Sequence, residues 1–172
     1  GWYYLVLFNT TDNWASRDVQ LVRTLSAEET VRSVLKSLYD YLHEQGVNYT
    51  SLTSSVFPNT QYVRLPSETL SQKSGNCIDG TLVYASAIES LGLNPVMVFV
   101  PGHVFLAVPT SENTESSFWV FLETTMTNSG DFDSAYMSAL DQFVTNCLES
   151  EQCEPVDIGL MRNYGVFPVN VK

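Results

Sequence analysis

Apolar and polar positions alternate with a helical period after residue 26 of this chain. Ser26 and Glu29 have the spacing of a capping box, in which each side chain bonds the backbone N–H of the other at the start of a helix. Apolar residues then recur on one helical face, at Val31, Val34, Leu35, Leu38 and Leu42. Gly46, which follows them, is typical of a helix end. The pattern therefore predicts an amphipathic helix that packs against a core.

Other stretches predict further helices. Residues 81–91 form a long apolar run without Gly or Pro, closed by Gly92, which indicates a buried helix. A later helix is expected to run to about Leu148. Its apolar face comprises Phe132, Ala135, Ala139 and Phe143. Residues 67–70 lie between the first helix and the run at 81–91. They are expected to form a single helical turn with Ser67 as its cap.

Short apolar runs bounded by turn residues predict the strands. The expected strands are residues 3–8, 95–100, 103–108 and 118–123. The last three follow one another with only a Pro-Gly turn and a polar loop between them, which predicts an antiparallel meander. Repeats, low-complexity segments and linkers are absent from the sequence. We therefore expect one α+β domain over residues 1–172, with the helix at 81–91 packed on the antiparallel sheet.

Composition and charge narrow the possible partners. The 172 residues are 44% apolar and 16% charged, which is typical of a globular protein. The sequence has eight Lys and Arg residues and nineteen Asp and Glu residues, which gives a net charge of −11. Such a balance argues against nucleic acid and anionic membrane surfaces as partners. No apolar run approaches the length that spans a bilayer, and residues 1–8 lack the flanks of a signal peptide, so membrane insertion is not expected.

Three cysteines bear on the compartment. Cys147 and Cys153 are separated by five residues, a spacing that suits a small disulfide loop and leaves Cys77 free. Three reduced thiols in a cytosolic protein are an equal alternative at this point. A disulfide would indicate an oxidising compartment. Together with the low Lys content, this favours an extracellular or periplasmic protein.

Cys77 is the first candidate for chemistry. It lies in the polar turn of residues 74–80, directly before the apolar run that predicts the buried helix. The N-terminus of a helix carries unpaired N–H groups and the positive end of the dipole, and both favour a thiolate. A thiolate there is a nucleophile. A small thiol that only packs beneath the helix is the alternative.

His103 and Glu123 are the partners that the expected sheet offers. His103 opens a strand after a Pro-Gly turn, at the rim of the sheet. If Val108 faces Phe118, closing the loop between the strands, then His103 faces Glu123. A base beside the thiol and a carboxylate that orients the base would complete a triad. Each residue alone has a structural explanation, as a hydrogen-bonded His at a strand edge or a solvated charge at a strand end.

Three segments around these residues resemble the transglutaminase-like superfamily, which shares a papain-like core. They are GNCID at 75–79, PGHVF at 101–105 and FLETT at 121–125. Residues 64–70 and 156–168 also resemble little-characterised prokaryotic members of that group. The resemblance implies a Cys-His-acid triad of Cys77, His103 and Glu123. The acid of this family is usually Asp, so Glu123 departs from the pattern.

The resemblance also implies an upstream oxyanion donor besides the Cys backbone N–H, for which Gln61 is the first candidate and Gln72 the second. The expected function is thiol acyl transfer on a peptide bond or a Gln side-chain amide, with a protein or peptide substrate. The sequence has no Ca²⁺-loop pattern, so metal dependence is not expected. No other cofactor is expected either. A protein-binding module on the same fold is the main alternative. A Zn²⁺ site built from Cys77, His103 and Glu123 is a further one.

Overall fold

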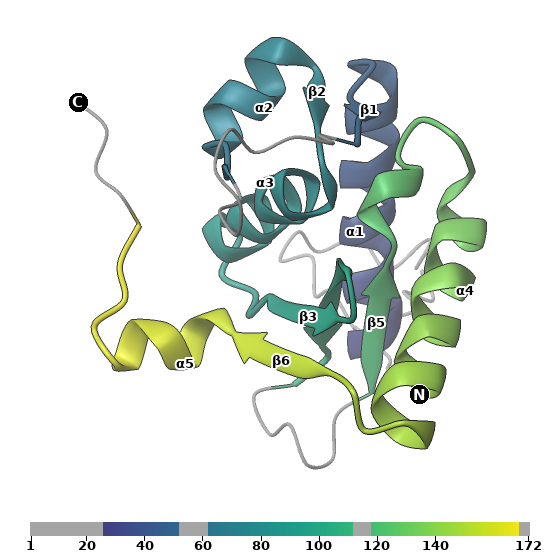
Figure 1. Cartoon of the computed structure of the whole chain (residues 1–172), viewed down its shortest axis with the longest axis vertical. Helices are drawn as coiled ribbons and strands as arrows, with labels where there is room; N and C mark the ends of the chain where they lie inside the picture. Colours follow the sequence, from purple (N-terminus) through teal and green to yellow (C-terminus); the bar gives the residue numbers. More distant parts are fainter. Residues whose placement is uncertain (1–25, 52–61, 112–117, 169–172) are drawn as a thin grey trace, which may run out of the picture.

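The computed structural model describes residues 26–51, 62–111 and 118–168 (Figure 1). These residues form a mixed α+β structure, with five α-helices and a four-stranded antiparallel sheet. Two predictions, the strand at residues 3–8 and the oxyanion donor Gln61, lie outside the described residues.

The sheet has the strand order β5-β4-β3-β6. Its strands are β3 (Val96–Val100), β4 (His103–Pro109), β5 (Trp119–Leu122) and β6 (Glu154–Asp157). The predicted meander of the first three is confirmed. Strand β6 was not predicted: it pairs antiparallel with β3, with Pro155 opposite Val98. A four-residue strand with Pro is tolerated because it lies at the edge of the sheet, where a missing N–H need not break a ladder.

The predicted register between β4 and β5 was wrong by two residues. Val108 pairs with Val120 and not with Phe118. The prediction assumed that Pro109 ends the strand, but the ladder continues through Pro109 opposite Trp119, and Thr110 N–H bonds the Phe118 carbonyl at 2.9 Å. Hydrogen-bonded and non-hydrogen-bonded pairs alternate in antiparallel strands, so Pro109 occupies a non-hydrogen-bonded pair and lacks no bond. A shift of two residues keeps every side chain on its predicted face.

Helix α1 (Ala27–Glu44) has the predicted capping box. Ser26 Oγ accepts from Glu29 N–H at 3.1 Å, and Glu29 Oε2 accepts from Ser26 N–H at 2.8 Å. Gly46 follows the helix with φ of 72°, a conformation that glycine adopts without strain. The buried residues of this helix are Val31, Leu35, Tyr39 and Leu42.

Helix α2 (Pro66–Gln72) differs from the prediction at its start. Ser67 was expected to cap it, but the helix begins earlier, with Leu65 at the cap position and Pro66 in the first turn. Proline is favoured there because its fixed φ suits a helix and its missing N–H would have no helical partner. After α2, β2 (Ser74–Gly75) pairs in parallel with β1 (Asn48–Tyr49).

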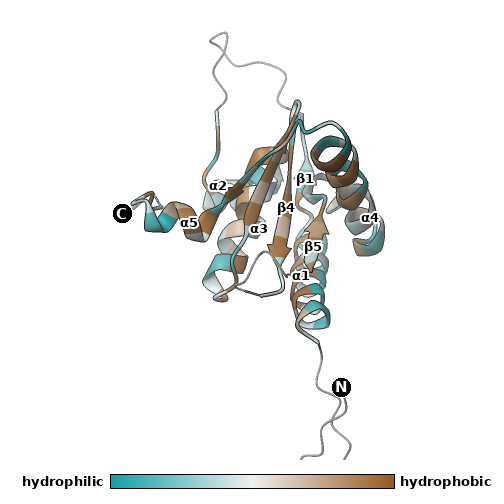
Figure 2. Ribbon diagram, turned by 90° about the horizontal axis from the view of Figure 1, so that it is seen from below, coloured by the Kyte–Doolittle hydropathy of each residue, from teal (hydrophilic) through white to brown (hydrophobic). Residues whose placement is uncertain are grey.

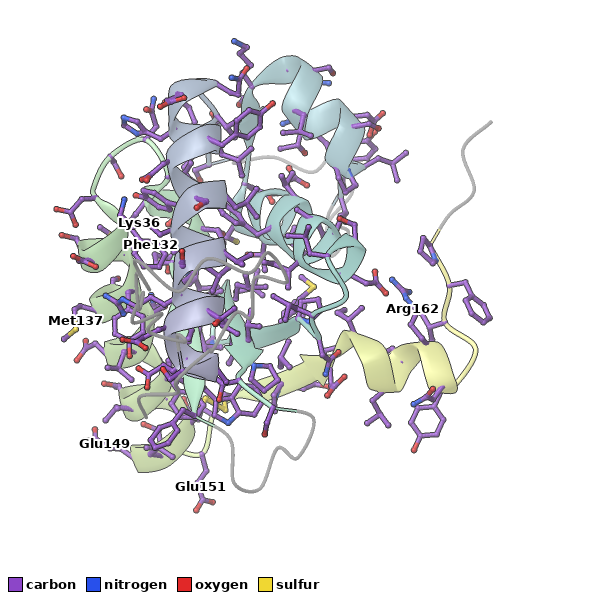
Figure 3. The ribbon with its side chains drawn as sticks, turned by 180° about the vertical axis from the view of Figure 1, so that it is seen from behind. Lys36, Phe132, Met137, Glu149, Glu151 and Arg162 are labelled. Atoms are coloured by element: carbon purple, nitrogen blue, oxygen red, sulfur yellow. A yellow bond between two sulfur atoms is a disulfide. The ribbon has the colours of Figure 1, made fainter. Side chains whose placement is uncertain are left out.

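Helices α3 (Cys77–Ser90) and α4 (Phe132–Phe143) cover the sheet. Figure 2 shows that the strands are predominantly apolar and lie between them. One core joins α1 and α3 to one face of the sheet, while Ala139 and Phe143 pack on the other face. Phe132, labelled in Figure 3, contacts the Tyr39 ring edge-on at 5.9 Å and so ties α4 to α1.

The predicted helix to about Leu148 exists, but its last part is π-helical, over Val144–Glu149. Cys147 in this part is disulfide-bonded to Cys153, with 5.0 Å between the Cα atoms, so this predicted disulfide is confirmed. Helix α5 (Ile158–Asn163) follows β6, and Arg162 bonds Glu89 of α3 at 2.7 and 2.9 Å. None of the described helices is long and apolar enough to cross a membrane.

Candidate active site

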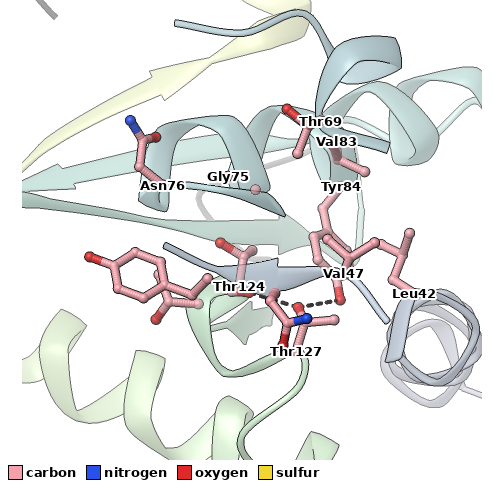
Figure 4. Close-up of a pocket in the computed structure, with 13 residues that line it drawn as sticks. Leu42, Val47, Thr69, Gly75, Asn76, Val83, Tyr84, Thr124 and Thr127 are labelled. Atoms are coloured by element: carbon pink, nitrogen blue, oxygen red, sulfur yellow. Dashed lines mark hydrogen bonds between the residues drawn. The ribbon is translucent and has the colours of Figure 1, made fainter. Parts of the chain in front are cut away.

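Gly75 makes the tight turn before Cys77 possible. A Cβ at this position would lie 2.7 Å from Asp79 Cβ and 2.9 Å from Thr69 Cγ2, closer than real contacts allow. Figure 4 shows Gly75 on the strand that leads into α3, with Thr69 above it. Only glycine therefore lets this strand lie against the first turn of the helix.

A reciprocal capping box then starts α3. Asn76 Oδ1 accepts from Asp79 N–H at 3.0 Å, and Asp79 Oδ2 accepts from Asn76 N–H at 3.1 Å. The fully buried Asp79 also accepts from Arg64 N–H at 2.8 Å through Oδ1. These bonds fix the orientation of the first helical turn. The residue that they orient is Cys77, the first residue of α3.

Threonine hydroxyls hold this end of α3 against the strands. Thr81 is fully buried and its Oγ1 lies 2.9 Å from Thr124 Oγ1 and 3.4 Å from the Val104 carbonyl. Helix α3, strand β4 and the 3₁₀ turn η2 (Thr124–Met126) thereby meet next to Cys77. This junction brings the three predicted site residues together from separate elements.

Cys77 is a free, partly buried thiol in an environment that favours the thiolate. A side-chain hydrogen bond with His103 lowers its pKa below the usual 9.0. Burial opposes this effect, whereas the charge of the imidazolium and the backbone N–H groups of Ile78 and Val104 add to it. The sulfur thus receives hydrogen bonds both from the helix terminus and from strand β4.

His103 links the thiol to the carboxylate. It is the first residue of β4 and follows Gly102, whose φ of 76° makes the turn. His103 Nε2 donates to Glu123 Oε2 at 2.6 Å, so Nδ1 is the ring nitrogen left for the Cys77 thiol. Hydrogen bonds to Cys77 and then to Glu123 raise the His103 pKa from 6.5 to about 9, against the effect of burial. Both shifts favour an imidazolium beside a thiolate over the neutral pair.

Glu123 reaches His103 diagonally. Strand β5 ends at Leu122, which pairs with Leu106, so Glu123 does not lie directly opposite His103 as predicted. Diagonal neighbours are about 7–8 Å apart at Cα, a distance that a long side chain can bridge. The pairing of His103 with Glu123 was therefore expected correctly, although the register used to derive it was wrong.

The Glu123 carboxylate is almost fully enclosed, with 4% of the side chain exposed, and four donors satisfy it. Oε2 accepts from His103 Nε2 and, at 2.7 Å, from Gln142 Nε2. Oε1 accepts from Thr125 Oγ1 at 2.6 Å and from Thr125 N–H at 3.0 Å. Burial raises its pKa, but the bonds from His103 and Thr125 outweigh burial and hold the Glu123 pKa below its usual value. Glu123 is therefore an ionised carboxylate that is hydrogen-bonded to the imidazole.

The Asn76–Asp79 capping box and the bond from Gln142 to Glu123 were not predicted from the sequence. The Asn76 and Asp79 pair has capping-box spacing directly before an apolar run, a signal that could have been used. Gln142 lies seven residues after Ala135, on the stripe that the apolar residues of α4 occupy. A polar residue on a buried stripe is a signal for a specific partner, but nothing in the sequence names Glu123 as that partner.

The second oxyanion candidate, Gln72, is exposed at the end of α2, and no bond joins it to Cys77. The backbone offers a donor instead. In the first turn of α3, Asp79 N–H is bonded to Asn76, and within the described part of the chain no group accepts from the Cys77 N–H. That N–H is available to an oxygen bound beside the sulfur.

The arrangement does not suit a metal ion. His103 lies between Cys77 and Glu123, and because its Nε2 is bonded to Glu123 only Nδ1 is left for Cys77, so the three side chains do not converge on one point. Across residues 26–51, 62–111 and 118–168, no three His, Cys, Asp or Glu side chains are grouped as metal ligands.

Comparison with protein families, curated proteins and solved structures finds no match for the chain.

Proposed function

We propose that this protein is a cysteine-dependent acyl-transfer enzyme that acts on peptide bonds or on Gln side-chain amides. The observation that carries the proposal is the connected line Cys77–His103–Glu123, with the thiol pKa lowered and the imidazole pKa raised. Perturbed titratable groups bonded in series are typical of a nucleophile, its base and an orienting acid.

The first half-reaction forms a thioester. The Cys77 thiolate attacks the amide carbonyl carbon, a C–S bond forms, and the carbonyl electrons move to oxygen. The oxyanion is stabilised by the Cys77 N–H at the helix terminus. When the tetrahedral intermediate collapses, the C–N bond breaks and the His103 imidazolium gives its proton to the leaving amine. The products are an acyl-enzyme, a free amine and neutral His103.

The second half-reaction releases the acyl group. Neutral His103 takes a proton from water or from an amine, and the oxygen or nitrogen attacks the thioester carbonyl. The C–S bond breaks and the sulfur leaves as a thiolate, next to the imidazolium that has just been formed. Glu123 stays ionised throughout and stabilises the imidazolium. Water as the acceptor gives a peptidase or amidase, and an amine gives cross-linking.

We also propose that the chain belongs to the transglutaminase-like group and has its papain-like core. Support comes from the order of the elements: the Cys opens a helix, the His opens the strand that this helix packs on, and the acid follows the next strand. An extracellular or periplasmic location goes with this proposal, because the Cys147–Cys153 disulfide is compatible with an oxidising compartment.

The direct test is to trap the acyl-enzyme. The protein is incubated with a set of Gln-containing peptides and peptide amides, quenched in acid, and searched by mass spectrometry for a thioester on Cys77. Hydroxylamine added in a parallel reaction should release the acyl group from the thioester as a hydroxamate. Cys77→Ser should abolish the adduct, and His103→Ala should slow its formation by ~10²–10⁴.

The chain offers a matched control for this experiment. His43 is exposed, on α1, and its Nδ1 bonds the Thr127 carbonyl at 2.9 Å, so His43→Ala should leave the adduct unchanged. If peptide electrophiles leave Cys77 unmodified while Cys77→Ala still binds the same peptides, the enzyme proposal fails. The binding-module alternative would then replace it.

A further inference from the structure

The Gln142 side chain enters the candidate site from the side of α4. Its Nε2 donates to Glu123 Oε2 at 2.7 Å, and the same oxygen accepts from His103 Nε2 at 2.6 Å. One carboxylate oxygen is thus shared by the imidazole and by an amide that belongs to none of the three sequence motifs. Gln142 is therefore linked to His103, the base of the proposed reaction, through a single oxygen atom, Glu123 Oε2.

Orientation of the carboxylate requires a bond at each oxygen. The last torsion of a Glu side chain has a broad energy profile, so the plane of the carboxylate is set by its partners. Thr125 holds Oε1 with two hydrogen bonds. A carboxylate held at Oε1 alone could still rotate and carry Oε2 along an arc. The Gln142 amide removes this freedom because it is a second donor at Oε2.

Gln142 is itself held in place by its surroundings. It is partly buried on α4, and Asn146 Nδ2 donates to its backbone carbonyl at 2.9 Å. The next residue, Phe143, packs against the Phe121 ring of β5 with 4.7 Å between ring centroids. Strand β5 leads into Glu123, so this contact fixes α4 against the strand that carries the acid.

We propose that Gln142 is a positioning residue: it orients the Glu123 carboxylate so that Oε2 remains in line with His103 Nε2. The consequence for catalysis rests on the proposed function, whereas the orientation itself does not. Gln142 takes no proton and does not touch the thiol. It acts only through Glu123.

Two effects of removing the amide have opposite signs. If Gln142 merely competes with His103 for Oε2, its loss strengthens the remaining bond and the His103 pKa rises. If Gln142 positions the carboxylate, its loss lets Oε2 move away from the imidazole and the His103 pKa falls. The sign of the change therefore distinguishes positioning from competition, whatever the effect on activity.

The test is an NMR titration of His103 in the wild type and in Gln142→Met, which keeps the side-chain length and a similar helix propensity. Positioning predicts a His103 pKa lower by at least about one unit. Asp141→Met, at the exposed neighbouring position, is the matched control and should leave the His103 pKa unchanged. An unchanged or raised His103 pKa in Gln142→Met would overturn the proposal.

A second variant pair tests whether Gln142 acts through Glu123. In a Glu123→Gln background, Gln142→Met should cause no further change in the His103 pKa, and an additional fall there would refute the proposal. A third measurement needs no variant: the side-chain amide protons of wild-type Gln142 should exchange more slowly than those of exposed Gln45. Equal exchange would also refute it. Failure of the acyl-enzyme experiment would leave these outcomes unaffected.

Discussion

The pH dependence of Cys77 alkylation offers the most direct measure of the thiolate. Cys77 is the free thiol of a chain whose other two cysteines are disulfide-bonded, so iodoacetamide reports on one site. The perturbation is His103→Ala, which removes the group responsible for the largest lowering of the Cys77 pKa. Burial, which raises this pKa, and the two backbone N–H donors would remain.

The size of the effect follows from the ionised fraction. The rise of the His103 pKa from 6.5 to about 9 corresponds to on the order of 3 kcal/mol in favour of the imidazolium. In His103→Ala this charge is absent, and the Cys77 pKa should return to the region of 9.0. A thiol with that pKa is ionised in only about one molecule in a thousand at pH 6. Wild-type Cys77, with its lowered pKa, should retain much more of its reactivity there.

The assay compares, for each protein, the alkylation rate at pH 6 with the rate at pH 10. This ratio cancels differences in intrinsic nucleophilicity and access between the variants. We expect the ratio to be far larger in the wild type and in His43→Ala than in His103→Ala, where it should approach ~10⁻³. Equal ratios in wild type and His103→Ala would refute the thiolate–imidazolium pair. Cys77 would then be an inert packing thiol.

Three further outcomes are expected. Glu123→Gln should keep the fold but lower acyl transfer, and circular dichroism with a turnover assay would check both; unchanged turnover would remove Glu123 from the mechanism. Gly75→Ala should destabilise the protein by ~1–3 kcal/mol in urea unfolding through overpacking, more than Gly80→Ala, whose Cβ would meet only Thr124 at ordinary contact distances of 3.5 and 3.8 Å. Replacing Cys147 and Cys153 together by Ser should cost stability at the modest end of ~2–4 kcal/mol, because the loop is short; an unchanged urea midpoint would contradict this.

Much of the fold could be predicted because local signals and tertiary structure agree. The capping box at Ser26 and the apolar stripe after it predict α1 to within a residue or two at each end. Strands β3, β4 and β5 were expected from apolar runs between turn residues. Strand β6 could not be read in this way, since it is four residues long and contains Pro. Its existence depends on the exposed edge of β3, which no local pattern reveals.

The turn before Cys77 shows where sequence reasoning ends. The position of Cys77 at a helix N-terminus followed from the apolar run after it, and α3 begins there. The parallel pairing of Tyr49 with Gly75, and the closeness of Gly75 to Thr69, come from residues far apart in the chain. The contact of Gly75 with Thr69 forms only when α2 packs on α3, and this packing is not visible in the sequence. The sequence shows only that the turn contains a glycine.

The length of the Glu123 side chain suits the observed register. His103 and Glu123 are diagonal neighbours, because β5 ends at Leu122 opposite Leu106. With the diagonal geometry, the carboxylate has a longer span to cover, and four donors hold it at the end of that span. The observed register therefore explains how the long Glu123 side chain reaches His103 from a strand that ends at Leu122.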